Sequence, residues 1–182
     1  MNDLRNDIYA IKSNFICLAE TWLNEDEIIE MEGWNFYNSS MGRGKGCCVF
    51  SKNQVQCTLI GKFATEDFSL LSLKIYERIQ LYVIYLSQTN NSVKDRLWEK
   101  IRDFRDENLQ LMLIGDFNID ARKFDVLTQH FLHNAMIQLV NEPTHIEGRI
   151  IDHVWVTKHL MNLHLSFQYP YYTQHKSLII KF

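Results

Sequence analysis

The segment LQLMLIGDFNID, residues 109–120, constrains the fold more than any other part of the chain. Five of its first six residues are apolar and suit a buried strand, and Gly115 then interrupts the run. Asp116 and Asn118 follow at once, and because they stand two positions apart they project to the same side of an extended chain. The segment therefore predicts a strand that crosses the core and holds an acid and an amide rigidly at the rim of a sheet.

Apolar runs of strand length recur along the chain, with turn-like stretches between them. The glycines of MGRGKGC, residues 41–47, supply one of these turns. Helical stretches interrupt the later strands without strict βαβ alternation, so we expect an α/β (α+β) protein with two sheets packed face to face and helices outside. The expected strands are 15–20, 34–39, 46–51, 55–61, 69–75, 79–85, 111–116, 150–156, 162–168 and 176–182.

Three stretches have a helical pattern of apolar residues, and residues 24–31 suggest a short acidic helix. We expect Ser92 to cap one helix, with Leu97 and Phe104 facing inward. In another helix we expect Phe124 and Leu127 to face inward. The expected helices are 3–12, 24–31, 92–106 and 123–135.

Length and composition fit one globular domain, and we expect residues 1–182 to form it. No linker, repeat or low-complexity stretch divides the chain. Hydrophobic residues make up 46% and charged residues 23%, which is ordinary for a globular protein. The formal net charge of −3 excludes a surface coated in basic residues, but it leaves room for a local basic patch.

The chain shows no pattern typical of membrane insertion or secretion. No run approaches the ~20 apolar residues of a membrane span, and MNDLRNDIYA lacks the apolar stretch of a signal peptide. The four cysteines show no Cys-x-x-Cys spacing, and we interpret them as reduced thiols in or near the core. We therefore expect an intracellular protein, nuclear or cytoplasmic, with no membrane partner.

Polar residues stand at the ends of several expected strands, where an apolar core would disfavour them. Strand ends that converge on one rim build a site on rigid supports. A carboxylate can deprotonate a water or bind magnesium, an amide can donate to an anionic oxygen, and Asp152 could hold His175 in one tautomer. The residues in question are Glu20, Tyr85, Asp116, Asn118, Asp152 and His175.

Each of these residues also has an ordinary structural interpretation. An Asp-x-Asn at a strand end is often a turn that hydrogen-bonds its own backbone. Glu20 and Thr21 can cap the next segment, Tyr85 can be a packing residue, and a lone histidine is usually on the surface or satisfied in the core. It is the coincidence of these residues at strand ends that favours a site.

Six stretches occur in an order that resembles one family: ICLAETWL, GKGCCVF, VIYLS, LIGDFNID, EPTHIEGRIIDHVWV and TQHKSLII. From about residue 3 to the C-terminus the chain resembles the endonuclease/exonuclease/phosphatase (DNase I-like) superfamily. Within that superfamily it is most similar to the endonuclease domains of non-LTR retrotransposons and related mobile elements. The resemblance implies a four-layered sandwich of two packed mixed sheets flanked by helices. It also implies phosphodiester hydrolysis with Mg²⁺ or Mn²⁺.

The resemblance further implies roles for the matching residues around the metal and the water. Glu20 looks like the metal-binding glutamate of the family. Asp116 matches the aspartate that activates the attacking water. Asn118 matches the asparagine that helps to orient this water and the phosphate.

Other matches concern the phosphate and the DNA backbone. Tyr85 is similar to the tyrosine that contacts the scissile phosphate, and Thr144 resembles a threonine near the DNA backbone. Asp152 matches the aspartate that pairs with the catalytic histidine. His175 matches that histidine, which would stabilise charge building on the phosphate.

The sequence departs from the family pattern in two places. The family opens with a strand that carries an asparagine, often written Asn-x-Arg-Ser, and here Met1 stands where the following helix would start. We therefore expect an N-terminally truncated domain without that strand. The family's Ser-Asp-His motif reads Thr173-Gln174-His175 here, and Gln174 cannot give a metal a negative charge or take a proton.

Three functions follow as hypotheses. The first is a magnesium-dependent DNA endonuclease of a retrotransposon-like element, intact or weakened, which acts as a monomer or within a larger mobile-element polyprotein. The second is a catalytically inactive remnant or binding module of the same fold. The third is a phosphatase that acts on lipid or small phosphoesters, since one fold hosts several activities.

Overall fold

The computed structural model describes residues 7, 10, 12–42, 44–170 and 173–181. Its strands are β1 Phe15–Ala19, β2 Trp34–Gly42, β3 Lys45–Lys52, β4 Cys57–Ala64, β5 Phe68–Ile75, β6 Ile79–Leu86, β7 Gln110–Asp116, β8 Met136–Gln138, β9 Asp152–Thr157, β10 His164–Gln168 and β11 Ser177–Lys181. Within the described residues they form three hydrogen-bonded sheets, with the orders β1-β3-β2, β4-β5-β6-β7-β9-β8 and β10-β11. The six-stranded sheet is mixed because β6 and β7 run parallel, whereas its other neighbours are antiparallel.

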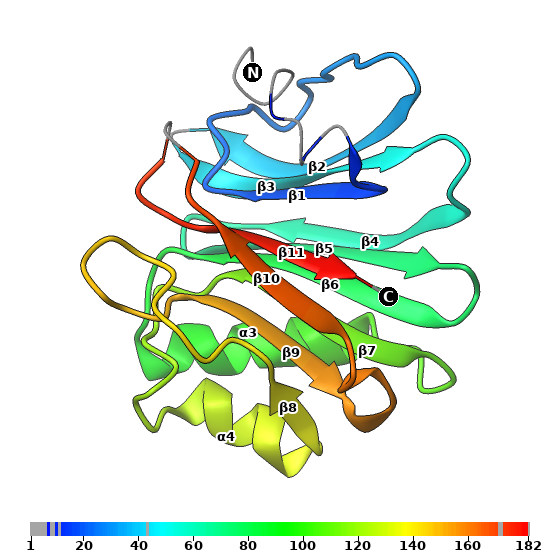
Figure 1. Cartoon of the computed structure of the whole chain (residues 1–182). Coiled ribbons are helices and arrows are strands. Elements are labelled where there is room, and N and C mark those ends of the chain that lie inside the picture. Colours follow the sequence, from blue (N-terminus) through cyan, green and yellow to red (C-terminus); the bar gives the residue numbers. More distant parts are fainter. Residues whose placement is uncertain (1–6, 8–9, 11, 43, 171–172, 182) are drawn as a thin grey trace.

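The two larger sheets lie face to face, and helices α3 (Asn91–Asp103) and α4 (Val126–His133) cover the outer face of the six-stranded sheet (Figure 1). One buried cluster fills the space between the sheets and includes Val83. A second cluster lies between the six-stranded sheet and the helices and includes Tyr82 and Phe131. Tyr82 and Val83 belong to different clusters because successive side chains of a strand point to opposite faces. This arrangement confirms the predicted α/β sandwich.

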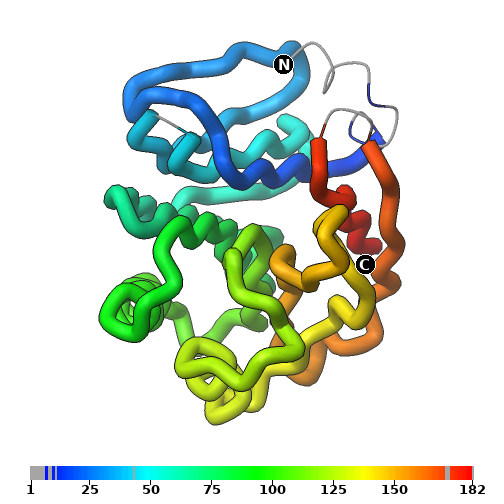
Figure 2. The backbone as a smooth tube through the Cα atoms, turned by 90° about the vertical axis from the view of Figure 1, so that its left-hand side faces the viewer, coloured from blue at the N-terminus to red at the C-terminus, as the bar shows by residue number. Residues whose placement is uncertain are grey.

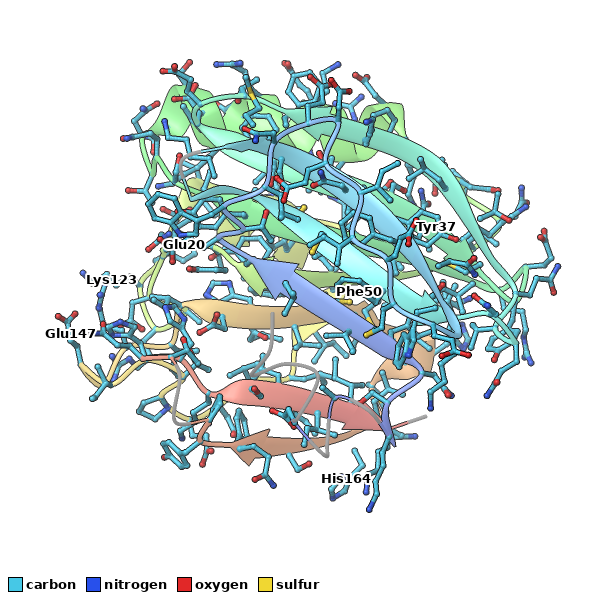
Figure 3. The ribbon with its side chains drawn as sticks, turned by 90° about the horizontal axis from the view of Figure 1, so that it is seen from above. Glu20, Tyr37, Phe50, Lys123, Glu147 and His164 are labelled. Carbon is cyan, nitrogen blue, oxygen red and sulfur yellow. The ribbon has the colours of Figure 1, made fainter. Side chains whose placement is uncertain are left out.

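The β10–β11 pair adds a feature that differs from the predicted two sheets. These two strands pair only with each other among the described residues. Their apolar side chains Leu165, Phe167, Leu178 and Ile180 pack against the cluster between the two larger sheets. The pair therefore closes one side of that core, next to β1 (Figures 1 and 3).

The sequence predicts a helix over residues 24–31, and the structure shows an irregular segment there. The Asn38 amide nitrogen explains the difference, because it donates to the backbone oxygens of Asn24, Glu25 and Glu27 at 2.8, 3.4 and 3.3 Å. Carbonyl oxygens that accept from β2 in this way are held outside a helical ladder. The segment instead covers the outer face of β1-β3-β2 with apolar side chains such as Ile29.

Both later helices are confirmed, but their first turns differ from the prediction. The N-cap of α3 is Asn90, whose side chain accepts from the Val93 amide, rather than Ser92. The α4 helix begins after Asp125, which caps it, so Phe124 precedes the helix and is exposed rather than inward-facing. Caps with a side-chain acceptor determine where a helix starts, and several residues before each helix can supply one.

Two further points concern the strand β8 and the helix expected over residues 3–12. The short strand β8 at the edge of the large sheet is absent from the prediction. The helix expected over residues 3–12 falls mostly on positions outside the described residues. Within the described part of the chain, no helix is both long and apolar enough to cross a membrane.

Candidate active site

Three polar side chains form a row across neighbouring strands of the large sheet. Tyr85 at the end of β6 is in register with Asp116 at the end of β7, and Asp116 is in register with Asp152 at the start of β9. Residues in register on neighbouring strands point to the same face. Val83 and Val154 stand two positions from Tyr85 and Asp152 and lie in the cluster between the two larger sheets. The row therefore points toward the three-stranded sheet β1-β3-β2.

Gly115 allows β7 to reach this position. Its φ of +141° lies in a region that side chains disfavour, and an added Cβ would stand 1.9 Å from the Ile84 carbonyl oxygen. Only glycine fits where β7 lies this close to β6. The break in the apolar run that marks the sequence LIGDFN therefore places Asp116 in register with its neighbours.

The turn after β7 fixes the Asp116 carboxylate. The Asn118 backbone N–H donates to Asp116 Oδ1 at 2.9 Å, and Asn118 adopts a positive φ of 51°. The Asn118 side-chain amide donates to the Leu86 carbonyl oxygen at 3.0 Å. This is the self-bonding turn of the ordinary interpretation, and it leaves the carboxylate and the amide in fixed orientations at the rim.

His175, just before β11, reaches the row from the small two-stranded sheet. Its Nδ1 lies 3.1 and 2.9 Å from the two carboxylate oxygens of Asp152. This hydrogen bond raises the pKa of His175 above its ordinary value, and burial acts in the opposite direction. Asp152 therefore favours the positively charged imidazolium and fixes which ring nitrogen faces it.

Glu20 approaches from the opposite sheet, one residue beyond β1. One carboxylate oxygen of Glu20, one carboxylate oxygen of Asp116 and one ring nitrogen of His175 all lie within 4.8 Å of one another. Figure 3 shows Glu20 on the same edge of the molecule as Lys123 and Glu147, which lie in the loops after β7 and before β9. Figure 2 looks onto this edge and its loops. The candidate site is therefore assembled from both sides of the sandwich.

The surroundings of Asp116 and Tyr85 raise the pKa of both side chains. The pKa of Asp116 is raised to about 7; burial is the largest cause, the neighbouring Asp152 charge also raises it, and the Asn118 N–H acts against both. The Asp116 side chain is only 4% exposed, which explains why burial is the largest cause. Burial, followed by the charges of Glu20 and Asp116, raises the pKa of Tyr85 to about 12, so its hydroxyl stays protonated at neutral pH.

Thr144 does not lie where the sequence places it. It is fully buried, and its hydroxyl accepts from the backbone N–H groups of Ile151 and Asp152, each at 3.1 Å. A buried hydroxyl with two donors has no surface to offer a DNA backbone. Thr144 instead fixes the backbone that carries Asp152. The sequence does not indicate this role, because EPTH is equally typical of an exposed turn.

Gln174 lies next to His175 and is exposed. Its carbonyl oxygen accepts from the Ile146 N–H at 3.0 Å. The position that the family fills with an acid is therefore beside the site, and it carries a neutral side chain here.

The sequence of the chain matches one protein family. A sequence model of the Endonuclease/Exonuclease/phosphatase family matches residues 1–173. The chain belongs to this family. Members of the endonuclease/exonuclease/phosphatase family are hydrolases, nucleases and phosphatases, and typically depend on a divalent metal, for which Glu20 and Asp116 offer suitable oxygens here. No curated protein matches the chain in sequence.

Solved structures share the fold of this family member at low sequence identity. The 3′ phosphatase NExo from Neisseria, bound to a product DNA hairpin, has a TM-score of 0.79 and 16% identity, over 100% of this chain and 93% of its own. An AP endonuclease from Archaeoglobus fulgidus has a TM-score of 0.75 and 15% identity, over 100% and 95%. The endonuclease domain of TRAS1, a telomere-specific non-LTR retrotransposon, has a TM-score of 0.65 and 10% identity, over 98% and 90%.

Proposed function

We propose that this protein is a divalent-metal-dependent DNA endonuclease of a retrotransposon-like element. The observation that carries the proposal is the position of Asp116, which lies between Tyr85 and the Asp152–His175 pair and faces Glu20. This arrangement combines a proton acceptor, a cation, a phenolic donor and a metal-binding carboxylate. These groups suit in-line hydrolysis of a phosphodiester.

Asp116 is the proton acceptor in this proposal. With a pKa of about 7 in the metal-free protein, a large fraction of Asp116 is ionised at neutral pH and can take a proton from water. The Asn118 N–H holds one carboxylate oxygen, so the other oxygen is oriented toward the water. The water oxygen then attacks phosphorus, and the bond to the leaving oxygen breaks.

His175 and Tyr85 stabilise the phosphate in this reaction. The Asp152 carboxylate raises the pKa of His175 and so favours the cationic ring, which can donate to an oxygen on which negative charge builds. The Tyr85 hydroxyl, with its raised pKa, is a neutral donor to the same group. Both donors are fixed before the substrate binds, which is where most of their effect arises.

Glu20 is the residue that would hold the metal. Magnesium and manganese accept one or two carboxylates and complete their shells with water, so one acid can suffice. When bound, the cation polarises the phosphate and neutralises part of its charge. We assign His175 to the phosphate rather than to the metal because its hydrogen bond to Asp152 raises its pKa and favours the imidazolium, which has no free lone pair for a metal.

The similar structures support DNA as the substrate. NExo is described with a product DNA hairpin, and both the Archaeoglobus and the TRAS1 proteins are described as endonucleases. We further propose that residues 1–182 act as one domain, either as a monomer or within a larger mobile-element polyprotein.

A phosphatase is the second candidate, because NExo is described as a 3′ phosphatase. A duplex oligonucleotide that ends in a 3′-phosphate separates the two with one substrate. Strand scission in the presence of Mg²⁺ supports the endonuclease. Release of inorganic phosphate from an otherwise intact strand supports the phosphatase. If neither product forms at any Mg²⁺ or Mn²⁺ concentration, the chain is an inactive member of the family.

A further inference from the structure

The Asp152–His175 pair spans two sheets, and a short segment joins them. The Lys176 N–H donates to the Thr144 carbonyl oxygen at 2.7 Å, and the Ile146 N–H donates to the Gln174 carbonyl oxygen at 3.0 Å. These bonds place His145 opposite His175 in an antiparallel bridge. The segment 144–146 therefore fixes the backbone that carries His175.

The same segment fixes the backbone of Asp152. The Thr144 hydroxyl accepts from the Ile151 and Asp152 N–H groups, as described above. The separation between the His175 and Asp152 backbones is thus set by two consecutive residues, Thr144 and His145. Small errors in such a separation matter, because a displacement of about 1 Å at a reacting group can cost 10²-fold in rate.

His145 also contacts the His175 ring directly. The two ring centroids lie 4.9 Å apart, and the ring planes meet at 78°, an edge-to-face contact. The hydrogen bond to Asp152 holds only one corner of the His175 ring, at Nδ1. A second contact is required to stop the ring from pivoting about that corner, and His145 supplies a flat surface for it.

His145 is itself held rigidly. Its Nδ1 accepts from the Glu147 N–H at 3.2 Å, and its own N–H donates to the Arg149 carbonyl oxygen at 3.1 Å. The Gly148 N–H donates to the His145 carbonyl oxygen at 2.9 Å and closes the turn. The His145 side chain is only 9% exposed, so it belongs to the structure beside the site rather than to the solvent.

We propose that His145 is a positioning residue whose flat ring, packed edge-to-face on His175, keeps the His175 ring in its orientation toward the phosphate. The catalytic consequence rests on the proposed function, whereas the restraint of the ring does not. The contact needs an aromatic ring of this size at residue 145, and it needs none of the acid–base chemistry of histidine.

Three variants test this requirement. His145→Ala removes the ring, and His145→Phe keeps a flat ring without nitrogen atoms. His130→Ala is the matched control, because His130 on α4 stacks on Trp98 at 5.3 Å in the outer helical layer. The expected kcat of His145→Ala falls on the order of 10- to 100-fold with KM within about threefold. We expect His145→Phe to recover wild-type kcat within about threefold, and His130→Ala to match wild type.

A second measurement needs no turnover. Carbon-13 relaxation of the His175 ring reports how tightly the ring is held on the nanosecond timescale. We expect its order parameter to fall in His145→Ala and to stay at the wild-type value in His145→Phe and His130→Ala. If His145→Ala does not fold, the comparison of His145→Phe with His145→Leu gives the same test, since leucine fills space without a flat ring.

The two measurements separate the inference from the proposed function. A wild-type protein without activity contradicts the endonuclease, and the order parameters still decide the role of His145. An unchanged His175 order parameter in His145→Ala overturns the inference, as does a kcat of His145→Phe as low as that of His145→Ala.

Discussion

Asp116 and Asp152 occupy directly opposed positions of the antiparallel β7–β9 pair. Two carboxylates at such positions repel each other and weaken the strand pairing. The structure offsets this repulsion on each side, since Asp152 bonds to His175 and Asp116 accepts from the Asn118 N–H. The two acids are therefore distinct, because one supports a cation and the other, with its raised pKa, is suited to accept a proton.

The first prediction concerns Asp152. Asp152→Asn removes the charge that supports the His175 cation, so we expect kcat/KM to fall about 10²- to 10⁴-fold. The same change removes a charge that raises the pKa of Asp116, so the acidic limb of the pH–rate profile should move to lower pH. Asp95→Asn is the control, because Asp95 pairs with His130 at 3.2 Å on the helical layer. Activity of Asp152→Asn within threefold of wild type would refute this role.

The raised pKa of Asp116 predicts how stability depends on pH. Between about pH 4 and 7 the folded protein retains a proton on Asp116 that the unfolded chain has lost, so stability falls as pH rises. Asp116→Asn removes this loss. In EDTA, we expect the Tm difference between the variant and wild type to grow from about pH 4 to 7, reaching ~3 °C or more, and then to level off. A Tm difference that does not change with pH would contradict the buried, perturbed carboxyl.

Gly115 gives a prediction about the fold beneath the site. Gly115→Ala places a Cβ 1.9 Å from the Ile84 carbonyl oxygen at a φ of +141°, so we expect a loss of about 2–5 kcal/mol in the free energy of unfolding. Gly33→Ala is the matched control, because Gly33 has a φ of +83° and no atom within 4 Å of the added Cβ. Its expected loss is about 1–2 kcal/mol. Urea unfolding of both variants measures the difference, and equal losses would show that the close approach of the strands is unimportant.

The fourth prediction is that an acid at position 174 raises the affinity for metal. Gln174→Asp places an acid next to His175, and we expect Mn²⁺ to bind about 10-fold more tightly in isothermal titration. Gln54→Asp adds the same charge in the exposed turn after β3, away from Glu20, and should leave the affinity unchanged. An equal affinity in both variants would mean that residue 174 does not face the metal.

The sequence predicts the sandwich because its strands are long and apolar. The apolar run of β6 and the break at Gly115 carry enough information to place Asp116 at a rim. The three residues of β8 are too few to show alternation, and its pairing with β9 depends on the rest of the sheet. The acidic segment 24–31 is expected to be a short helix, but the Asn38 side chain in β2 holds its carbonyl oxygens. This contact joins distant residues, and no local pattern contains it.

The candidate site was predictable as a set of residues and less so as a geometry. Strand ends indicate Glu20, Asp116 and Asp152, because acids at the ends of apolar runs are unusual. They do not indicate that Thr144 is buried beneath Asp152, or that His145 packs on His175. Both depend on how the turn before β9 meets the segment before β11, which is set by packing between separate sheets.

The most direct test of the central claim is cleavage of a supercoiled plasmid. The proposed function predicts that wild-type protein nicks the plasmid with Mg²⁺, that EDTA stops the reaction, and that Asp116→Ala lowers the rate at least ~10²-fold. Asp103→Ala, which removes an exposed carboxylate from α3, should cleave at the wild-type rate. Absence of Mg²⁺-dependent nicking by the wild type, or equal nicking by Asp116→Ala, would contradict the proposed function.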